Sequence, residues 1–199
     1  MKRGKRMMTN ILVILGSTLI VWIVLTVVVG KKGPEKVAVI GMPNAGHKAL
    51  IVYDPDPIYN LDEKISKSFA EGLSEKGWVS KVVTVAAAKN FEKEFFDLYV
   101  FCANTYNWAP DRAIRNHIKN NDYLQGEHVV AITLGSGSTK RSQRLLEDLI
   151  KQKDAILIDS RTFWLMKPNT ESKTKRSNSK IAVEKANNFG KEVAERIKK

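Results

Sequence analysis

Cysteine and histidine are scarce in this sequence, and their scarcity excludes two kinds of protein. Cys102 is the only cysteine among the 199 residues, so an internal disulfide framework cannot form. The three histidines stand at positions 47, 117 and 128, too far apart for the spacing of metal ligands. The sequence therefore predicts neither a disulfide-rich domain nor a metal site.

Acidic residues are outnumbered, but the excess of positive charge is unevenly placed. The formal net charge of +12 comes from 33 basic and 21 acidic residues, and most of the excess lies in residues 1–36 and 167–180. A nucleic-acid-binding protein would carry its basic residues as a patch on the globular part. Basic clusters beside an apolar segment instead predict proximity to anionic lipid, and we expect no nucleic-acid partner.

One long hydrophobic run is present, because Ile11–Val29 contains no charged residue. As a helix it would span about 28 Å at ~1.5 Å per residue, close to the ~30 Å hydrocarbon core of a bilayer. A cleaved signal peptide is the alternative, but its apolar region is usually only about 7–15 residues long. We expect an uncleaved, single-pass anchor with membrane lipid as its partner. Basic residues before the run outnumber those after it, which favours an extracytoplasmic soluble domain.

Beyond this run, short apolar stretches alternate with amphipathic ones. We expect a membrane anchor at 1–30, a linker at 31–47 and a domain at 48–199. Within the linker, KVAVIGM is either an extra strand or extended chain. The expected strands are 49–53, 79–85, 98–102, 129–134 and 155–158, and the longer expected helices are 61–76, 111–119, 140–153 and 181–197. Apolar strands that alternate with helices predict a parallel sheet covered on both faces. The expected fold class is therefore α/β, a three-layer doubly wound five-stranded parallel sheet with one N-terminal transmembrane helix.

The loop after the third expected strand is rich in aromatic and polar side chains, with the sequence TYNWAP at residues 105–110. This segment resembles the corresponding loop of the flavodoxin family, and so do ITLGSGSTKRSQRLLE and DAILIDSRTFW further along the chain. The resemblance covers about residues 48–199 and implies the strand order 2-1-3-4-5. It also implies that the loop lies against the ring of FMN, with an aromatic side chain stacked on that ring.

The site that this resemblance implies comes from three loops at one end of the sheet, where ligands bind in open α/β folds. Its residues would be Thr105, Tyr106, Asn107, Trp108, Gly135, Ser136, Gly137, Tyr59 and Asn60. Aromatic faces can stack on a flat ring, while hydroxyl, amide and backbone N–H groups can bond to its edge. The alternative is structural: Trp108 would pack against Pro110, and residues 135–137 would form a flexible turn before a capped helix.

The loop after the first expected strand lacks the residues with which flavodoxins hold phosphate. That family uses serine and threonine hydroxyls and backbone N–H groups at the start of a helix. Here the sequence is DPDPIYN at Asp54–Asn60, without glycine, serine or threonine. Pro55 and Pro57 remove two N–H donors, and Asp54 and Asp56 place negative charge in the loop. Two like charges ~4 Å apart repel by about 1 kcal/mol in water and about 4 kcal/mol at an effective dielectric constant of 20. A standard FMN phosphate site is therefore disfavoured.

Two other families resemble parts of the chain less well. The sequence VYDPDPI is similar to the D-x-D-x-[TV] motif of haloacid-dehalogenase-like phosphatases, but Ile58 takes the last position and LGSGS lacks their later acidic pair. Receiver domains share the strand order, but Asp97 begins the third strand, whereas their phosphate-accepting aspartate follows it. No catalytic acid, base or nucleophile follows from the sequence.

Two functions therefore stay open. In the first, a membrane-anchored flavoprotein binds FMN in an atypical way and exchanges electrons with a membrane redox partner. In the second, the flavin site is lost and the domain is a cofactor-free binding or scaffold module. The aromatic loop favours the first function, and the acidic proline-containing loop favours the second. Both interpretations require that the two loops face each other across one crevice.

Overall fold

The computed structural model describes residues 2–29, 33–56, 58–171 and 175–197. The chain divides into two compact units, Met1–Lys31 and Lys32–Lys199. The first unit holds helix α1 (Lys2–Val29), whose large apolar side chains between Met7 and Leu25 are exposed. The expected transmembrane helix is not found, because no helix in the described part of the chain is both long enough and apolar enough to cross a membrane. Membrane attachment through Ile11–Val29 stays a prediction from the sequence.

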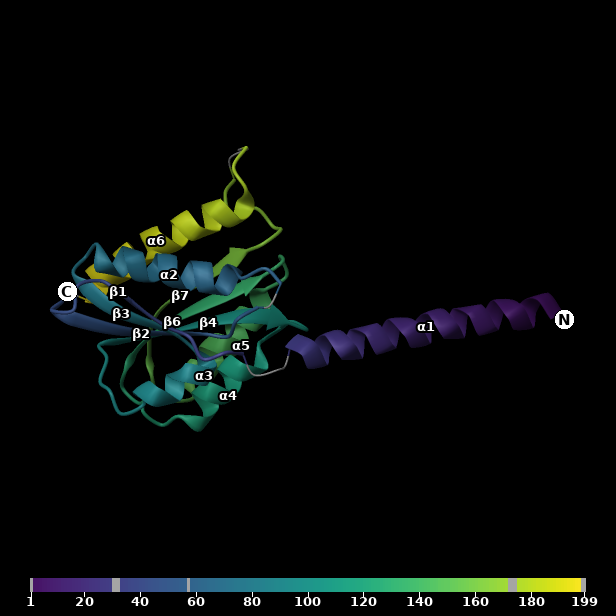
Figure 1. Cartoon of the computed structure of the whole chain (residues 1–199), viewed down its shortest axis with the longest axis horizontal. Helices are drawn as coiled ribbons and strands as arrows, with labels where there is room; N and C mark the ends of the chain where they lie inside the picture. The colour runs from purple at the N-terminus through teal and green to yellow at the C-terminus, as the bar shows by residue number, and fades with distance from the viewer. Residues whose placement is uncertain (1, 30–32, 57, 172–174, 198–199) are drawn as a thin grey trace. The chain divides into compact units, whose positions relative to one another are not determined.

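The second unit, which we call the globular unit, is built on one sheet of seven strands (Figure 1). The strands are β1 (Val37–Ile40), β2 (His47–Tyr53), β3 (Trp78–Thr84), β4 (Leu98–Tyr106), β5 (Ala109–Pro110), β6 (His128–Gly135) and β7 (Ile156–Trp164). Their order is β1-β3-β2-β4-β6-β7, and β5 pairs with β4. The parallel part, β3-β2-β4-β6-β7, has the expected order 2-1-3-4-5.

The sheet is mixed, which corrects the expected purely parallel five-stranded sheet. Strand β1 lies antiparallel to β3 at one edge, with Val37 opposite Val83. It falls within residues 31–47, the expected linker. Along β1, exposed Val37 and Val39 alternate with half-buried Ala38 and Ile40, as a short edge strand requires. In a run of only four residues, the alternation of side chains is too brief to distinguish a strand from extended chain.

Helices cover both faces of the sheet (Figure 1). Helices α2 (Leu61–Ser74) and α6 (Asn178–Ile197) lie on one face. The other face carries α3 (Val85–Ala88), the 3-10 helix η1 (Lys89–Phe91), α4 (Arg112–Asn120) and α5 (Lys140–Lys151). The expected three-layer arrangement is therefore confirmed for the globular unit.

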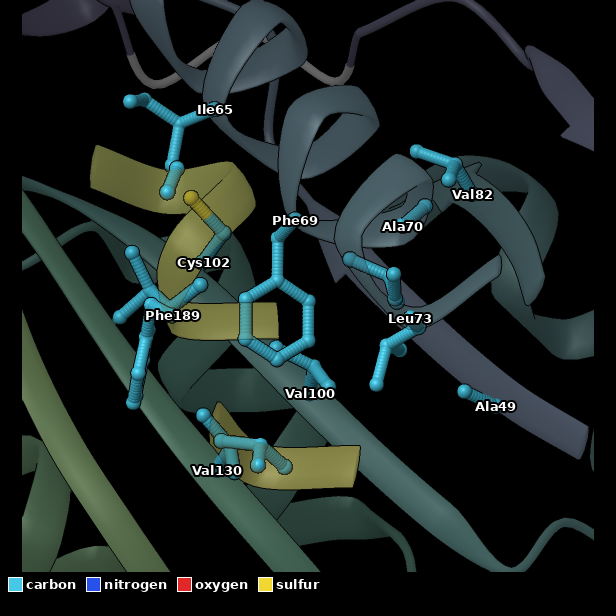
Figure 2. Close-up of a cluster of buried hydrophobic side chains, with 14 of the residues drawn as sticks. Ala49, Ile65, Phe69, Ala70, Leu73, Val82, Val100, Cys102, Val130 and Phe189 are labelled. Carbon is cyan, nitrogen blue, oxygen red and sulfur yellow. The ribbon is translucent and has the colours of Figure 1, made fainter. Parts of the chain in front are cut away.

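The core beneath α2 and α6 is closely packed (Figure 2). Phe69 of α2 meets Phe189 of α6 edge-on, with 5.3 Å between ring centroids. The two helices approach backbone to backbone: a Cβ at Gly72 would lie 2.0 Å from the Asn187 carbonyl oxygen, and one at Gly190 would lie 2.2 Å from the Phe69 carbonyl oxygen. This contact fixes α2 on the sheet, and with it the loop that leads from β2 into α2.

Candidate functional site

A pocket of about 160 Å³ lies where β2, β4 and β6 end. We call it the crevice, and its lining comes from loops that are far apart in the sequence. The lining residues are Asp56, Tyr59, Leu61, Asn104, Thr105, Tyr106, Leu134, Gly135, Ser136 and Leu165. The crevice therefore occupies the carboxyl end of the parallel strands, where ligands bind in open α/β sheets.

The loop after β2 and the hairpin after β4 face each other across the crevice. The Tyr106 hydroxyl donates a hydrogen bond to Asp56 Oδ2 at 2.7 Å. Partial burial and the negative charge of Asp56 raise the pKa of Tyr106 above its usual range, so the phenol keeps its proton and acts as the donor. The expectation that these two loops share one crevice is confirmed.

The second carboxylate oxygen of Asp56 folds back onto its own loop. Asp56 Oδ1 accepts the backbone N–H of Ile58 at 2.7 Å and that of Tyr59 at 3.0 Å. This is an Asx turn, in which an aspartate side chain binds backbone groups two and three residues ahead. The N–H groups that precede α2, and that would otherwise point towards an anion, are therefore already bonded to an anionic group of the same chain.

A buried network of hydrogen bonds holds this loop in place. Asp62, in the first turn of α2, accepts hydrogen bonds from the Asn104 side-chain amide at 3.0 Å and from the backbone N–H of Asp56. The Asn104 amide also donates to the Asp54 carbonyl oxygen at 3.1 Å. Asn104 thus ties the end of β4 to both ends of the loop after β2.

Asp111 joins the same network from the start of α4. Its Oδ1 accepts the Ile114 backbone N–H at 2.8 Å, which caps the helix, and its Oδ2 accepts the Asn104 backbone N–H at 3.0 Å. Burial raises the pKa of Asp111 to about 8, although these two N–H donors lower it in part. Burial also raises the pKa of Asp54 to about 6, with a contribution from the negative charge of Asp62.

The structure brings together five of the residues that the sequence singled out. Thr105, Tyr106, Gly135, Ser136 and Tyr59 all line the crevice. The Thr105 hydroxyl is buried and has no hydrogen-bond partner in the described part of the chain. A Cβ on Gly135 would lie 3.1 Å from the Thr105 Cβ, so the absence of a side chain at Gly135 keeps this wall of the crevice close-packed.

The remaining expected residues, Asn107, Trp108, Gly137 and Asn60, do not line the crevice. Asn107 and Trp108 both have positive φ angles, of 51° and 59°, between the paired residues Tyr106 and Ala109. This is the geometry of a tight two-residue hairpin, and it carries Trp108 out to the surface, where it is 59% exposed. Trp108 therefore neither packs in the core nor covers the crevice.

Trp164, at the end of β7, is held beside the loop after β6. Its indole N–H donates to the Thr139 hydroxyl oxygen at 2.9 Å, and the Lys167 ammonium lies 4.3 Å from the centre of its ring. The Trp164 ring therefore stacks with a cation of the next loop and does not line the crevice.

The residues of the crevice do not fit the phosphate of FMN. Three N–H groups of this loop are already bonded to carboxylates: those of Ile58 and Tyr59 to Asp56, and that of Asp56 to Asp62. A phosphate dianion there would displace the Asp56 carboxylate and face it at close range, with Asp54 and Asp62 nearby. The volume of about 160 Å³ is also below the ~300–1,000 Å³ of usual ligand pockets.

Comparisons with known proteins bear on the fold. No protein-family model matches the sequence, and no curated protein does. Solved structures do match. An archaeal flavodoxin superposes with a TM-score of 0.54 at 13% identity, over 76% of this chain and 99% of that protein. Flavodoxin 1 from Bacillus cereus gives a TM-score of 0.55 at 12% identity, over 74% of this chain and 97% of that one.

A larger protein matches over one of its parts. The flavodiiron protein of Giardia intestinalis superposes with a TM-score of 0.59 at 15% identity, and the match covers 75% of this chain but only 36% of that protein. At such identities the likeness concerns the fold. Together with the strand order and the helices on both faces, it shows that this chain has the flavodoxin-like fold.

Proposed function

We propose that the globular unit is a flavodoxin-like binding module that works without FMN. One observation carries the proposal: the Asp56 carboxylate takes the backbone N–H groups of Ile58 and Tyr59 and the hydroxyl of Tyr106. An anion position at the start of α2 is thus filled by the protein itself. A ligand of this crevice would be small and would carry no phosphate.

A second candidate is electron transfer through a flavin that is held by its ring rather than by its phosphate. It is favoured by the likeness in fold to flavodoxins and by Thr105, whose buried hydroxyl in the crevice wall has no partner among the described residues. In this second function, the edge of the flavin ring would form hydrogen bonds with Thr105 and with backbone groups of residues 135–136. Electrons would pass to or from a membrane redox partner.

Flavin titration separates the two candidates. The full chain, purified in detergent, is expected to be colourless, and added FMN or riboflavin should keep its full fluorescence. If the ring alone is held, both flavins should bind with similar affinity and lose fluorescence on binding. A purified chain that is yellow, or one that binds FMN much more tightly than riboflavin, would refute the first proposal.

We also propose that the apolar run Ile11–Val29 attaches the chain to a membrane, with the globular unit on the extracytoplasmic side. The sequence supports this proposal, because the run is uncharged and basic residues flank it. Extraction of cell membranes at high pH tests attachment, and the full chain should stay in the membrane fraction. Protease added outside intact cells tests the side, and it should digest the globular unit only if that unit lies outside.

A further inference from the structure

The crevice end of the globular unit carries positive charge at its surface. By crevice end we mean the loops after β2, β4, β6 and β7 and the first turns of the helices that follow them. The exposed basic residues in those first turns are Lys64, Arg112, Lys140, Arg141 and Lys180. Within the described part of the chain, none of them forms an ion pair. Of the carboxylates at this end, Asp54, Asp62 and Asp111 are buried, Asp56 and Glu63 are half-buried, and Glu171 is exposed.

These cations occupy positions that a helix does not favour for its own stability. The N-terminus of a helix carries partial positive charge and is stabilised by acidic side chains. Helices α4, α5 and α6 have no acidic residue in their first turns. Helix dipoles and basic side chains therefore add up to a positive field at this end, which would attract an external anionic surface.

Four exposed apolar side chains lie at the same end. Ile58 and Tyr59 project from the loop after β2, Trp108 from the hairpin after β4 and Met166 from the loop after β7, and all are between 51% and 70% exposed. A single exposed apolar residue needs no explanation, but several on neighbouring loops mark an interaction surface. Tryptophan and tyrosine are the side chains that favour the boundary between lipid and water.

The course of the chain agrees with this location. A Cβ at Gly33 would lie 2.9 Å from the Pro55 ring, so the globular unit begins directly beside the loop after β2. In the sequence, Gly33 follows the apolar run Ile11–Val29 after a few residues. The globular unit therefore begins at the crevice end.

We infer that the crevice end docks on an anionic lipid surface. Lys64, Arg112, Lys140 and Arg141 would contact the phosphates of the headgroups, and Ile58, Trp108 and Met166 would enter the boundary region. A nucleic acid would use the charges but would leave the aliphatic side chains Ile58 and Met166 without a function. This inference is independent of whether the crevice holds a ligand.

Cysteine labelling of the full chain tests the docking. In the W108C variant the new thiol lies at the crevice end, and in the matched variant F95C it lies on an exposed loop before β4, at the opposite end of the sheet. The native Cys102 is fully buried and gives a low background. With vesicles that contain phosphatidylglycerol, a water-soluble maleimide should label W108C roughly tenfold more slowly than with pure phosphatidylcholine vesicles, while F95C should not change.

Charge reversal completes the test. The triple variant R112E/K140E/R141E on the W108C background should restore fast labelling, and acidic residues at helix N-termini should leave the fold intact. Equal labelling of W108C with both kinds of vesicle would overturn the inference. Protection of W108C by duplex DNA but not by phosphatidylglycerol would assign the surface to a nucleic acid instead.

Discussion

The Tyr106 hydroxyl lies 2.7 Å from Asp56 Oδ2, and this hydrogen bond joins the hairpin after β4 to the loop after β2. It spans fifty positions of sequence and closes one side of the crevice. The same carboxylate holds the N–H groups of Ile58 and Tyr59. One aspartate side chain thus organises both walls of the crevice, and several measurable properties depend on it.

Removal of the Tyr106 hydroxyl should weaken the globular unit. In Tyr106→Phe the ring stays in place but Asp56 Oδ2 loses its donor, so the free energy of unfolding should fall by about 1–2 kcal/mol. Urea unfolding followed by circular dichroism measures this change. Tyr59→Phe is the matched control, because Tyr59 is exposed, and it should change the stability by less than ~0.5 kcal/mol. Equal effects of the two substitutions would contradict the assignment.

Asp111 should make the stability depend on pH. Burial raises its pKa from an ordinary 3.8 to about 8 in the folded protein, so the folded state keeps a proton that the unfolded state releases. Stability from this group is therefore fully present below about pH 4 and is lost as the pH rises through about 8. Between about pH 6.5 and 8, Asp54, with a pKa of about 6, contributes little to this change.

Comparison with Asp111→Asn tests this dependence. The wild-type free energy of unfolding should fall across that range with a slope of up to about 1.4 kcal/mol per pH unit, and the variant should lose this slope. Asp122→Asn is the control, since Asp122 is an exposed carboxyl whose ion pair with Lys153 lowers its pKa. An unchanged slope in Asp111→Asn would show that Asp111 is already ionised in the folded protein.

The contact between α2 and α6 should not tolerate a methyl group. In Gly190→Ala the new Cβ would meet the Phe69 carbonyl oxygen of α2, and neither backbone can move without disturbing the core. The free energy of unfolding should fall by about 1–3 kcal/mol or more, as measured in urea. Gly46→Ala is the control, because nothing lies within 4 Å of a Cβ there. A neutral Gly190→Ala would mean that the two helices are less closely packed than the structure indicates.

The sequence predicted most of the sheet, because continuous apolar strands leave a strong local pattern. The core of β2, for example, is a run of apolar residues from Ala49 to Tyr53 that is buried throughout. At the edge strand β1 the sequence did not decide between a strand and extended chain, since half of its side chains are exposed. The hairpin at Asn107-Trp108 was missed because such turns usually carry glycine, and tryptophan at positive φ gives no local signal.

The site was harder to predict than the fold. The charges of Asp54 and Asp56 were recognised, but the number of charges does not show from which N–H groups a carboxylate accepts hydrogen bonds. One signal was available for the Asx turn at Asp56. An aspartate just before a helix often accepts the backbone N–H groups two and three residues ahead, here those of Ile58 and Tyr59. Asn104, Asp62 and Asp111 were missed, because their contacts join β4 with α2 and α4 and have no signature within a short window.

The most direct test of the account is FMN binding by Asp56→Ala compared with Asp56→Asn. Alanine has no side-chain acceptor and should free both N–H groups, so FMN should bind at least ~10-fold more tightly than to the wild type. Asparagine is also neutral, but its carbonyl oxygen can still accept both N–H groups, so binding should stay at the wild-type level. Fluorescence titration of the three full-length proteins gives the answer. Equal gains in both variants, or strong FMN binding by the wild type, would contradict the claim that the Asp56 side chain fills the anion position.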